Sequence, residues 1–237
     1  MRRTAEIERK TGETEIYIRL DIDGKGIAKL SYPLGFMTHM LNTFARHGLF
    51  DIEAHAKGDL ETDQHHLVED TGIVLGQCFA KALGEKRGIL RSGSCLFPMD
   101  ETLARAAVDI SGRPYLYFEG QLSGSPIISA AQNCGSNLPA GGEPGEFDST
   151  RRVKTSCAYD FQTDVIEDFW QAFVNAAGCN LHLEIIRGRS DHHKIEAMFK
   201  AAARALRSAC EYDSRVKDSI PSTKGILPGF GAPGVLV

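Results

Sequence analysis

The chain contains the sequence His-His-x-x-Glu twice, and each copy stands at the head of a stretch with helical periodicity. The first copy is His65-His66-Leu67-Val68-Glu69 and the second is His192-His193-Lys194-Ile195-Glu196. Four of the eight histidines of the chain therefore fall in two matching clusters. Such a repeat predicts an internal duplication, in which each half contributes an equivalent helix.

Both copies have the donor atoms of a metal site. Residues three and four apart are neighbours on a helix, so each glutamate shares a surface with both histidines of its copy. Imidazole and carboxylate, with no cysteine at matching spacing, suit Mn, Fe or Zn. Adjacent histidines point about 100° apart on a helix, so each copy can serve two ions. For a single copy, solvated surface residues at the start of a helix would be the simpler explanation, because histidine and glutamate are common on protein surfaces. The presence of two copies favours metal binding.

The expected elements repeat in the same order as the motif. In the first half, strands over 15–20 and 27–31 flank Gly24 and Gly26, which predict a hairpin. A helix over 37–48, a strand over 51–57 and the first motif helix, which runs towards Leu83, follow. After that helix, strands over 88–97, 102–110 and 115–119 are separated by Pro98 and by 111–114.

A helix with Thr163 as its N-cap, a strand over 181–186 and a second motif helix towards Cys210 follow. The order predicts an α+β fold of duplicated α/β halves, with helices packed on mostly antiparallel sheets. We expect one catalytic unit, with residues 1–97 as the first half, 98–212 as the second and 213–237 as a tail. Residues 121–159, rich in Ser, Gly, Pro and Asn, predict a surface insertion in preference to a lid.

Composition excludes several classes of protein. The chain has 237 residues, 42% of them hydrophobic, and a net charge of -4, which argues against general nucleic-acid binding. No apolar run reaches the length of a membrane span, and the first residues lack the apolar segment of a secretory signal, which predicts a cytoplasmic protein. The six cysteines form no C-x-x-C pair, so reduced thiols are expected.

The residues between these motifs resemble the imidazoleglycerol-phosphate dehydratase family of histidine biosynthesis. The resemblance rests on matching stretches that cover nearly the whole chain except the insertion: 9–14, 39–41, 44–48, 58–60, the two His-His-x-x-Glu motifs, 98–101, 111–114, 181–183 and 221–225. It implies a ribosomal protein S5 domain 2-like duplication and a homo-oligomer of 24 subunits with active sites at interfaces. It also implies two Mn²⁺ ions per site and a phosphorylated imidazole substrate.

Carried over by position, the resemblance assigns the site residues. The metal ligands would be His39, His65, His66, Glu69, His182, His192, His193 and Glu196. The two metals would stabilise the imidazolate form of the substrate ring while water is lost. Glu13 is the first candidate for proton transfer and His47 the second. Both would also contact substrate, together with the expected phosphate-binding residues Arg91, Arg113, Lys200, Ser222, Thr223 and Lys224.

The chain departs from the family pattern beside two of these ligands. Thr38 and Gln64 stand where an aspartate usually precedes a metal-binding histidine. A neighbouring carboxylate commonly orients the imidazole and raises its basicity, so these departures predict altered metal affinity. Two alternatives stay open at this point: another binuclear metalloenzyme such as a hydrolase, and a metal-stabilised structural assembly.

Overall fold

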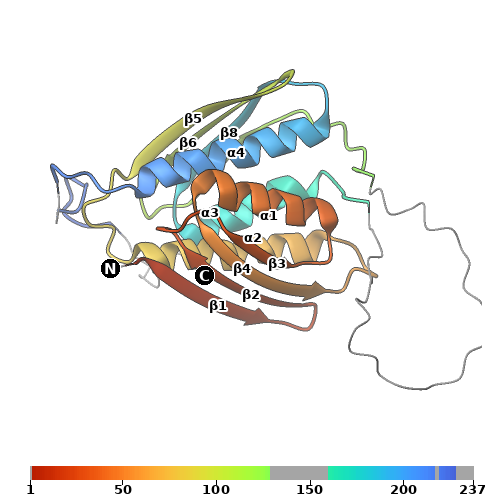
Figure 1. Ribbon diagram of the computed structural model, residues 1–237, viewed down its shortest axis with the longest axis horizontal. Helices are drawn as coiled ribbons and strands as arrows, with labels where there is room; N and C mark the ends of the chain where they lie inside the picture. The colour runs from red at the N-terminus through yellow and green to blue at the C-terminus, as the bar shows by residue number, and fades with distance from the viewer. Residues whose placement is uncertain (1, 129–159, 217–218, 228–237) are drawn as a thin grey trace, which may run out of the picture.

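The computed structural model describes residues 2–128, 160–216 and 219–227 of the chain. Within these residues, two four-stranded sheets form the outer layers and four helices lie between them (Figure 1). The first half contains β1 (Thr4–Lys10), β2 (Thr14–Asp21), β3 (Ala28–Ser31), α1 (Gly35–Gly48), β4 (Asp51–Gly58) and α2 (His65–Leu83). The second half contains β5 (Ser92–Met99), β6 (Thr102–Asp109), β7 (Tyr115–Glu119), α3 (Val165–Ala177), β8 (Asn180–Arg187) and α4 (Asp191–Cys210).

The two sheets have the same topology. Their strand orders are β1-β2-β4-β3 and β5-β6-β8-β7, and in each the last pair, β3 with β4 or β7 with β8, is parallel while the others are antiparallel. By position, α1 corresponds to α3 and α2 to α4. The predicted α+β fold with duplicated halves is therefore confirmed.

Alternation of side chains explains why the sheets lie outside and the helices inside. On β2, Ile16, Ile18 and Leu20 are buried against the helices, while the residues between them face outward. Between the helices, aromatic rings from both halves meet, and the Phe44 and Trp170 centroids lie 6.2 Å apart. Because one apolar layer is shared, neither half buries its core without the other.

Two glycines of α2 allow α2 and α3 to approach closely. A Cβ atom at Gly72 would lie 2.4 Å from the carbonyl oxygen of Phe169, and one at Gly76 would lie 2.4 Å from that of Phe173. These contacts are with backbone, which cannot rotate away as a side chain can. The head of α2, which carries the first motif, is thereby held against α3.

The prediction of a hairpin at Gly24 and Gly26 is wrong. The hairpin joins β1 to β2, and β3 pairs in parallel with β4. Sequence reasoning missed β1 because its outward face is charged and Ala5 is its only fully buried hydrophobic residue. A strand at the edge of a sheet needs little apolar character.

Two further boundaries differ from expectation. Pro98 lies inside β5, which begins at Ser92 and not at Gly88. This is possible because β5 is an edge strand, where a missing N–H donor costs no ladder bond. Thr163 does not cap α3: Asp164 holds that position without a side-chain cap, and the Thr163 hydroxyl is buried without a hydrogen-bond partner.

The expected boundary between residues 97 and 98 falls inside β5, which belongs to the second sheet, and we propose that the halves divide before Ser92.

Most of the predicted insertion, residues 129–159, lies outside the described residues, as do Cys134 and Cys157. The described cysteines, Cys78, Cys95, Cys179 and Cys210, are free thiols. In the described parts of the chain, no helix has both the length and the apolar character of a membrane span.

Replacing Gly76 with alanine tests the close packing of α2 on α3. Alanine favours a helix over glycine by at most about 1 kcal/mol, but overpacking against the Phe173 carbonyl costs about 1–3 kcal/mol. We expect the melting temperature of Gly76→Ala to fall by several degrees. Gly35→Ala, at the open first residue of α1 where an added Cβ meets nothing, is the control and should not lower it. A melting temperature of Gly76→Ala equal to that of wild type would contradict this packing.

Candidate metal centre and active site

A buried carboxylate gathers two histidines from different halves of the chain. Glu196 and His192 lie one turn apart on α4, and their Oε2 and Nε2 atoms are 3.2 Å apart. His39 of α1 brings its Nε2 atom to 3.3 Å from the same oxygen. The three ligand atoms all lie within 4.8 Å of one another, and in the described residues this is the only group of three or more metal-type side chains so placed.

This arrangement fits a divalent cation. An ion about 2.1 Å from each donor separates neighbouring donors by about 3.0–3.4 Å, which matches the two N···O distances of 3.2 and 3.3 Å. Two imidazoles and one carboxylate leave further coordination positions for water or substrate. The residues present therefore fit the metal that the sequence predicts.

Lys200 holds Glu196 from the other side. Its Nζ atom lies 2.9 Å from Oε1 of Glu196, which leaves Oε2 for the two histidines. Burial acts to raise the pKa of Glu196, but the hydrogen bond and positive charge of Lys200, followed by those of His39, outweigh burial and lower that pKa. Glu196 is thus kept ionised, as a metal ligand must be.

His47 lies two turns beyond His39 on α1, where cations surround it. Its ring meets the Phe97 ring edge-on at 5.3 Å, and Lys200 and Arg204 both lie over that Phe97 ring. Burial, and then the charges of Lys200 and Arg204, lower the pKa of His47. A neutral imidazole is therefore favoured at this position.

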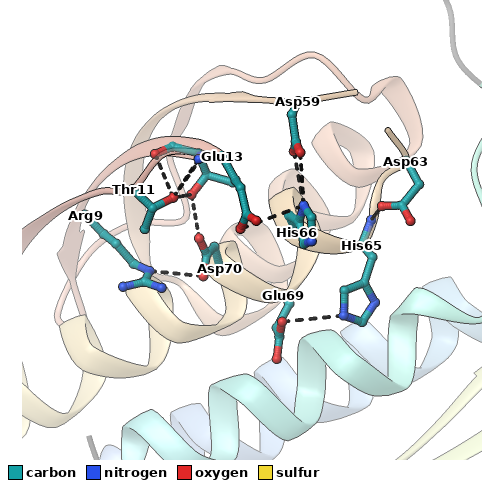
Figure 2. A network of polar contacts seen from close by, with 10 residues as sticks. Arg9, Thr11, Glu13, Asp59, Asp63, His65, His66, Glu69 and Asp70 are labelled. Carbon is teal, nitrogen blue, oxygen red and sulfur yellow. Dashed lines mark hydrogen bonds and ion pairs between the residues drawn. The ribbon is translucent and has the colours of Figure 1, made fainter. Parts of the chain in front are cut away.

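The first motif forms a second cluster at the head of α2 (Figure 2). Two carboxylates converge on the His66 ring: Oδ2 of Asp59 lies 3.1 Å from Nδ1, and Oε2 of Glu13 lies 3.9 Å from it. The hydrogen bond with Asp59 raises the pKa of His66. His65 points elsewhere, with Nε2 at 3.5 Å from Glu69 and Nδ1 at 3.3 Å from Asp168 of α3. The two adjacent histidines therefore contact different carboxylates, and the prediction that each copy serves two ions stays a prediction.

The hairpin turn that carries Glu13 is fixed to α2. The Thr11 hydroxyl accepts hydrogen bonds from the backbone N–H groups of Glu13 and Thr14, and the Thr14 hydroxyl donates to Asp70 (Figure 2). Arg9 also bonds Asp70 at 3.0 Å. Asp70 directly follows Glu69 of the motif, so the helix that bears the histidines also places the Glu13 carboxylate beside His66.

Both motif helices begin at the same end of the molecule (Figure 1). The Phe36 ring contacts the His192 ring at 5.1 Å and the Phe161 ring at 4.9 Å, while Gln162 donates to the side chain of Gln64 beside the first motif. A single chain thus presents two half-sites at one end, the first with Glu13 and the second with His39.

The expected phosphate-binding residues lie mainly at the opposite end. Arg91 precedes β5, and its backbone N–H donates a hydrogen bond to the carbonyl of Ala209, near the end of α4. About 25 Å of helix therefore separates Arg91 from His192 at the start of α4. Its guanidinium is bound to both oxygens of Asp109 and to the carbonyl of Pro221, which positions the loop at 222–225. Arg113 is exposed near the same end. Of the predicted set, only Lys200 lies beside the metal cluster.

His182 is also placed apart from the other predicted ligands. It is exposed on the outer face of the second sheet, with its ring 5.7 Å from that of Tyr115 and 5.6 Å from that of Tyr117. One chain therefore brings together His39, His192 and Glu196, but not His182 or the loop at 222–225.

Three carboxylates that sequence reasoning did not assign, Asp59, Glu101 and Asp168, hold ring nitrogens of the motif histidines. Oε2 of Glu101 lies 2.8 Å from Nδ1 of His193, and this hydrogen bond, followed by that from the Ser190 backbone, lowers the pKa of Glu101. Asp59 and Glu101 fall in recognised stretches of the sequence, but nothing local to them shows which helix they reach.

The two departures from the family pattern have structural explanations. The Thr38 hydroxyl donates to the carbonyl of Leu34, 2.9 Å away. The buried Gln64 amide donates to the carbonyl of Asp160 and accepts from the N–H of Gln162, so it fastens the segment that leads into α3. Asp168 supplies the carboxylate beside His65 that position 64 lacks.

Comparison with known proteins identifies the family to which this chain belongs. The sequence pattern of imidazoleglycerol-phosphate dehydratase matches residues 33–134 and 145–206. The enzyme of that name from Caldanaerobacter subterraneus subsp. tengcongensis is 46% identical over 225 residues, which is 95% of this chain and all of that protein. The chain belongs to the imidazoleglycerol-phosphate dehydratase family.

Solved structures of the imidazoleglycerol-phosphate dehydratase family have the same fold. The Staphylococcus aureus dehydratase superimposes with a TM-score of 0.66 at 33% identity, over 89% of this chain and 99% of that one. The Pyrococcus furiosus protein gives a TM-score of 0.66 at 27% identity, over 93% and 100%. The chain is thus an enzyme, a lyase of histidine biosynthesis, which decides against the hydrolase and structural-assembly alternatives.

Replacing Gln64 with alanine tests its role as a clamp. The change removes two partly buried hydrogen bonds of a buried side chain, one to the Asp160 carbonyl and one from the Gln162 N–H, which costs about 1–3 kcal/mol in total. We expect the free energy of unfolding in urea to fall by that amount. Gln171→Ala, which removes only an exposed bond to Asn175 on α3, is the control and should change it by less than about 0.5 kcal/mol. Equal effects of the two substitutions would contradict the clamp.

Proposed function

We propose that this chain dehydrates imidazole glycerol phosphate to imidazole acetol phosphate with the aid of a bound divalent metal, and that this metal is Mn²⁺. The observation that carries the proposal is the convergence of His39, His192 and Glu196 beside Lys200, in a chain of the dehydratase family. Two ions per site, as the sequence predicts, would use the ligands of both motifs. Bound cations would supply positive charge that stabilises the substrate's ring once it is deprotonated.

Glu13 has the properties of the proton-transfer group. Its side chain is 57% exposed, and among the described residues its one ion-pair contact is with the His66 ring at 3.9 Å, so no short ion pair from these residues occupies it. Its backbone is fixed by Thr11, which lowers the cost of holding the carboxylate in place. A substrate bound at the His66 side would have this carboxylate within reach of its carbon-bound proton.

His47 and Lys200 supply the polar surroundings of the second half-site. The lowered pKa of His47 favours an imidazole that can donate one hydrogen bond and accept another at neutral pH. Lys200 adds a cation beside Glu196 that can attract an anionic substrate. Arg91, Arg113, Ser222, Thr223 and Lys224 stay our proposed phosphate-binding residues.

We propose that active sites form between copies of this chain, in the assembly of 24 subunits expected for the family. The separation of the 222–225 loop from the metal cluster by about 25 Å of α4 supports this, because no single chain joins the two ends. The exposed rings of Tyr115 and Tyr117 around His182 make an outer sheet face on which a neighbouring chain can pack.

A cytoplasmic location also stays a proposal.

The conversion of imidazole glycerol phosphate by the assembled protein tests the function directly. Apo-protein prepared with a chelator should be inactive, and added Mn²⁺ should restore formation of the ketone, followed by mass spectrometry. Absence of turnover with metal fully bound would contradict the proposal.

Replacing Glu13 with glutamine separates proton transfer from metal binding. Because the amide cannot take up a proton, we expect turnover to fall by at least about 100-fold, while bound Mn²⁺, measured by elemental analysis, stays unchanged. Glu15→Gln is the control, since Glu15 is an exposed carboxylate paired with Lys10, and it should keep full activity. Unimpaired turnover of Glu13→Gln would exclude the carboxylate from proton transfer.

A further inference from the structure

The duplication gives Glu13 a counterpart in the second half. The hairpin between β1 and β2 corresponds to the one between β5 and β6, because the sheets share one topology. Glu13 directly precedes Thr14, the first residue of β2, and Glu101 directly precedes Thr102, the first residue of β6. Each glutamate lies near the second histidine of its own half.

The two glutamates differ in how they meet that histidine. Glu101 contacts Nδ1 of His193 at 2.8 Å, whereas Glu13 stays 3.9 Å from Nδ1 of His66. In the first half Asp59, the residue directly after β4, takes the short contact at 3.1 Å. The residue directly after β8 is Gly188, which has no side chain to offer. Each half thus supplies one carboxylate to this nitrogen, from a different loop.

Glu101 is held in place by its other oxygen. Oε1 accepts hydrogen bonds from the backbone N–H groups of Ser190 at 3.0 Å and Arg189 at 3.2 Å. Ser190 is in turn the N-cap of α4, where its hydroxyl accepts from the N–H of His193. The carboxylate therefore has a fixed direction relative to the first turn of the motif helix.

We propose that Glu101 is a positioning residue that fixes the ring of His193 for metal binding. A carboxylate oxygen at Nδ1 keeps the ring proton there, so Nε2 carries the free lone pair and points away from Glu101. The inference rests on the proposed function, since it assumes that His193 is a metal ligand. The inference also explains why the two corresponding glutamates have different roles. Because Asp59 binds His66, Glu13 is available for proton transfer, whereas Glu101 itself binds His193.

Glutamine at position 101 is the informative substitution. If its oxygen keeps the bonds to the backbone of Arg189 and Ser190, its NH₂ group faces Nδ1 of His193. The nitrogen must then accept, which moves the ring proton to Nε2 and removes the ligand lone pair. Glu101→Gln therefore preserves the loop but weakens the metal site, whereas a purely structural carboxylate would leave the site intact.

Titration of Mn²⁺ into the assembled apo-protein by calorimetry tests the inference. We expect Glu101→Gln to weaken binding by about 10–100-fold, with an unchanged melting temperature of the apo-protein. Ser190→Ala, which removes the α4 cap, is the matched control: it should lower the melting temperature but leave metal affinity as it is. Turnover of Glu101→Gln should recover at high Mn²⁺ concentration, and that of Glu13→Gln should not.

Each outcome decides the question. Wild-type affinity in Glu101→Gln would overturn the inference while leaving the proposed function intact. An equal loss of affinity in Glu101→Gln and Ser190→Ala, each with a lower melting temperature, would assign Glu101 a structural role and also overturn it. Wild-type protein that binds no Mn²⁺ would overturn the metal-dependent function together with the inference.

Discussion

The buried carboxylate of Glu196 is the interaction on which the candidate site depends. It receives Lys200 on one oxygen and the two histidines, His39 and His192, near the other. His39 comes from α1 of the first half, so the contact joins the two halves of the duplicated fold at the head of α4. An unpaired buried carboxylate is costly, so this convergence of cationic and imidazole groups stabilises the fold as well as assembling the proposed metal site.

Duplication has given the two halves the same framework and different uses for it. Both place a histidine pair at the start of the helix that follows a parallel strand pair, and both aim a hairpin glutamate at the second histidine. The identity of the residue after β4 or β8 then separates the roles. Asp59 releases Glu13 in the first half, whereas Gly188 leaves Glu101 to hold His193.

The local parts of this site could be predicted from the sequence, and the long-range parts could not. His65 and Glu69, like His192 and Glu196, are four residues apart on one helix, so periodicity alone places them together. The α+β duplication followed from the repeated order of elements. In contrast, β1 was missed because its outward side chains are charged, and the roles of Asp59, Glu101 and Asp168 depend on packing between distant elements. His39 was found through the family resemblance and not through any local spacing.

The loop at 222–225, which carries Lys224, lies far from the metal ligands, so the proposal of shared active sites can be tested on the assembly. The most direct measurement mixes two variants, His192→Ala and Lys224→Ala, each expected to be inactive in its own assemblies, and assays mixed assemblies verified by mass spectrometry. Sites built between chains predict activity well above that of either variant, because some sites then combine an intact His192 with an intact Lys224 from another copy. Mixed assemblies as inactive as their parents would contradict shared sites.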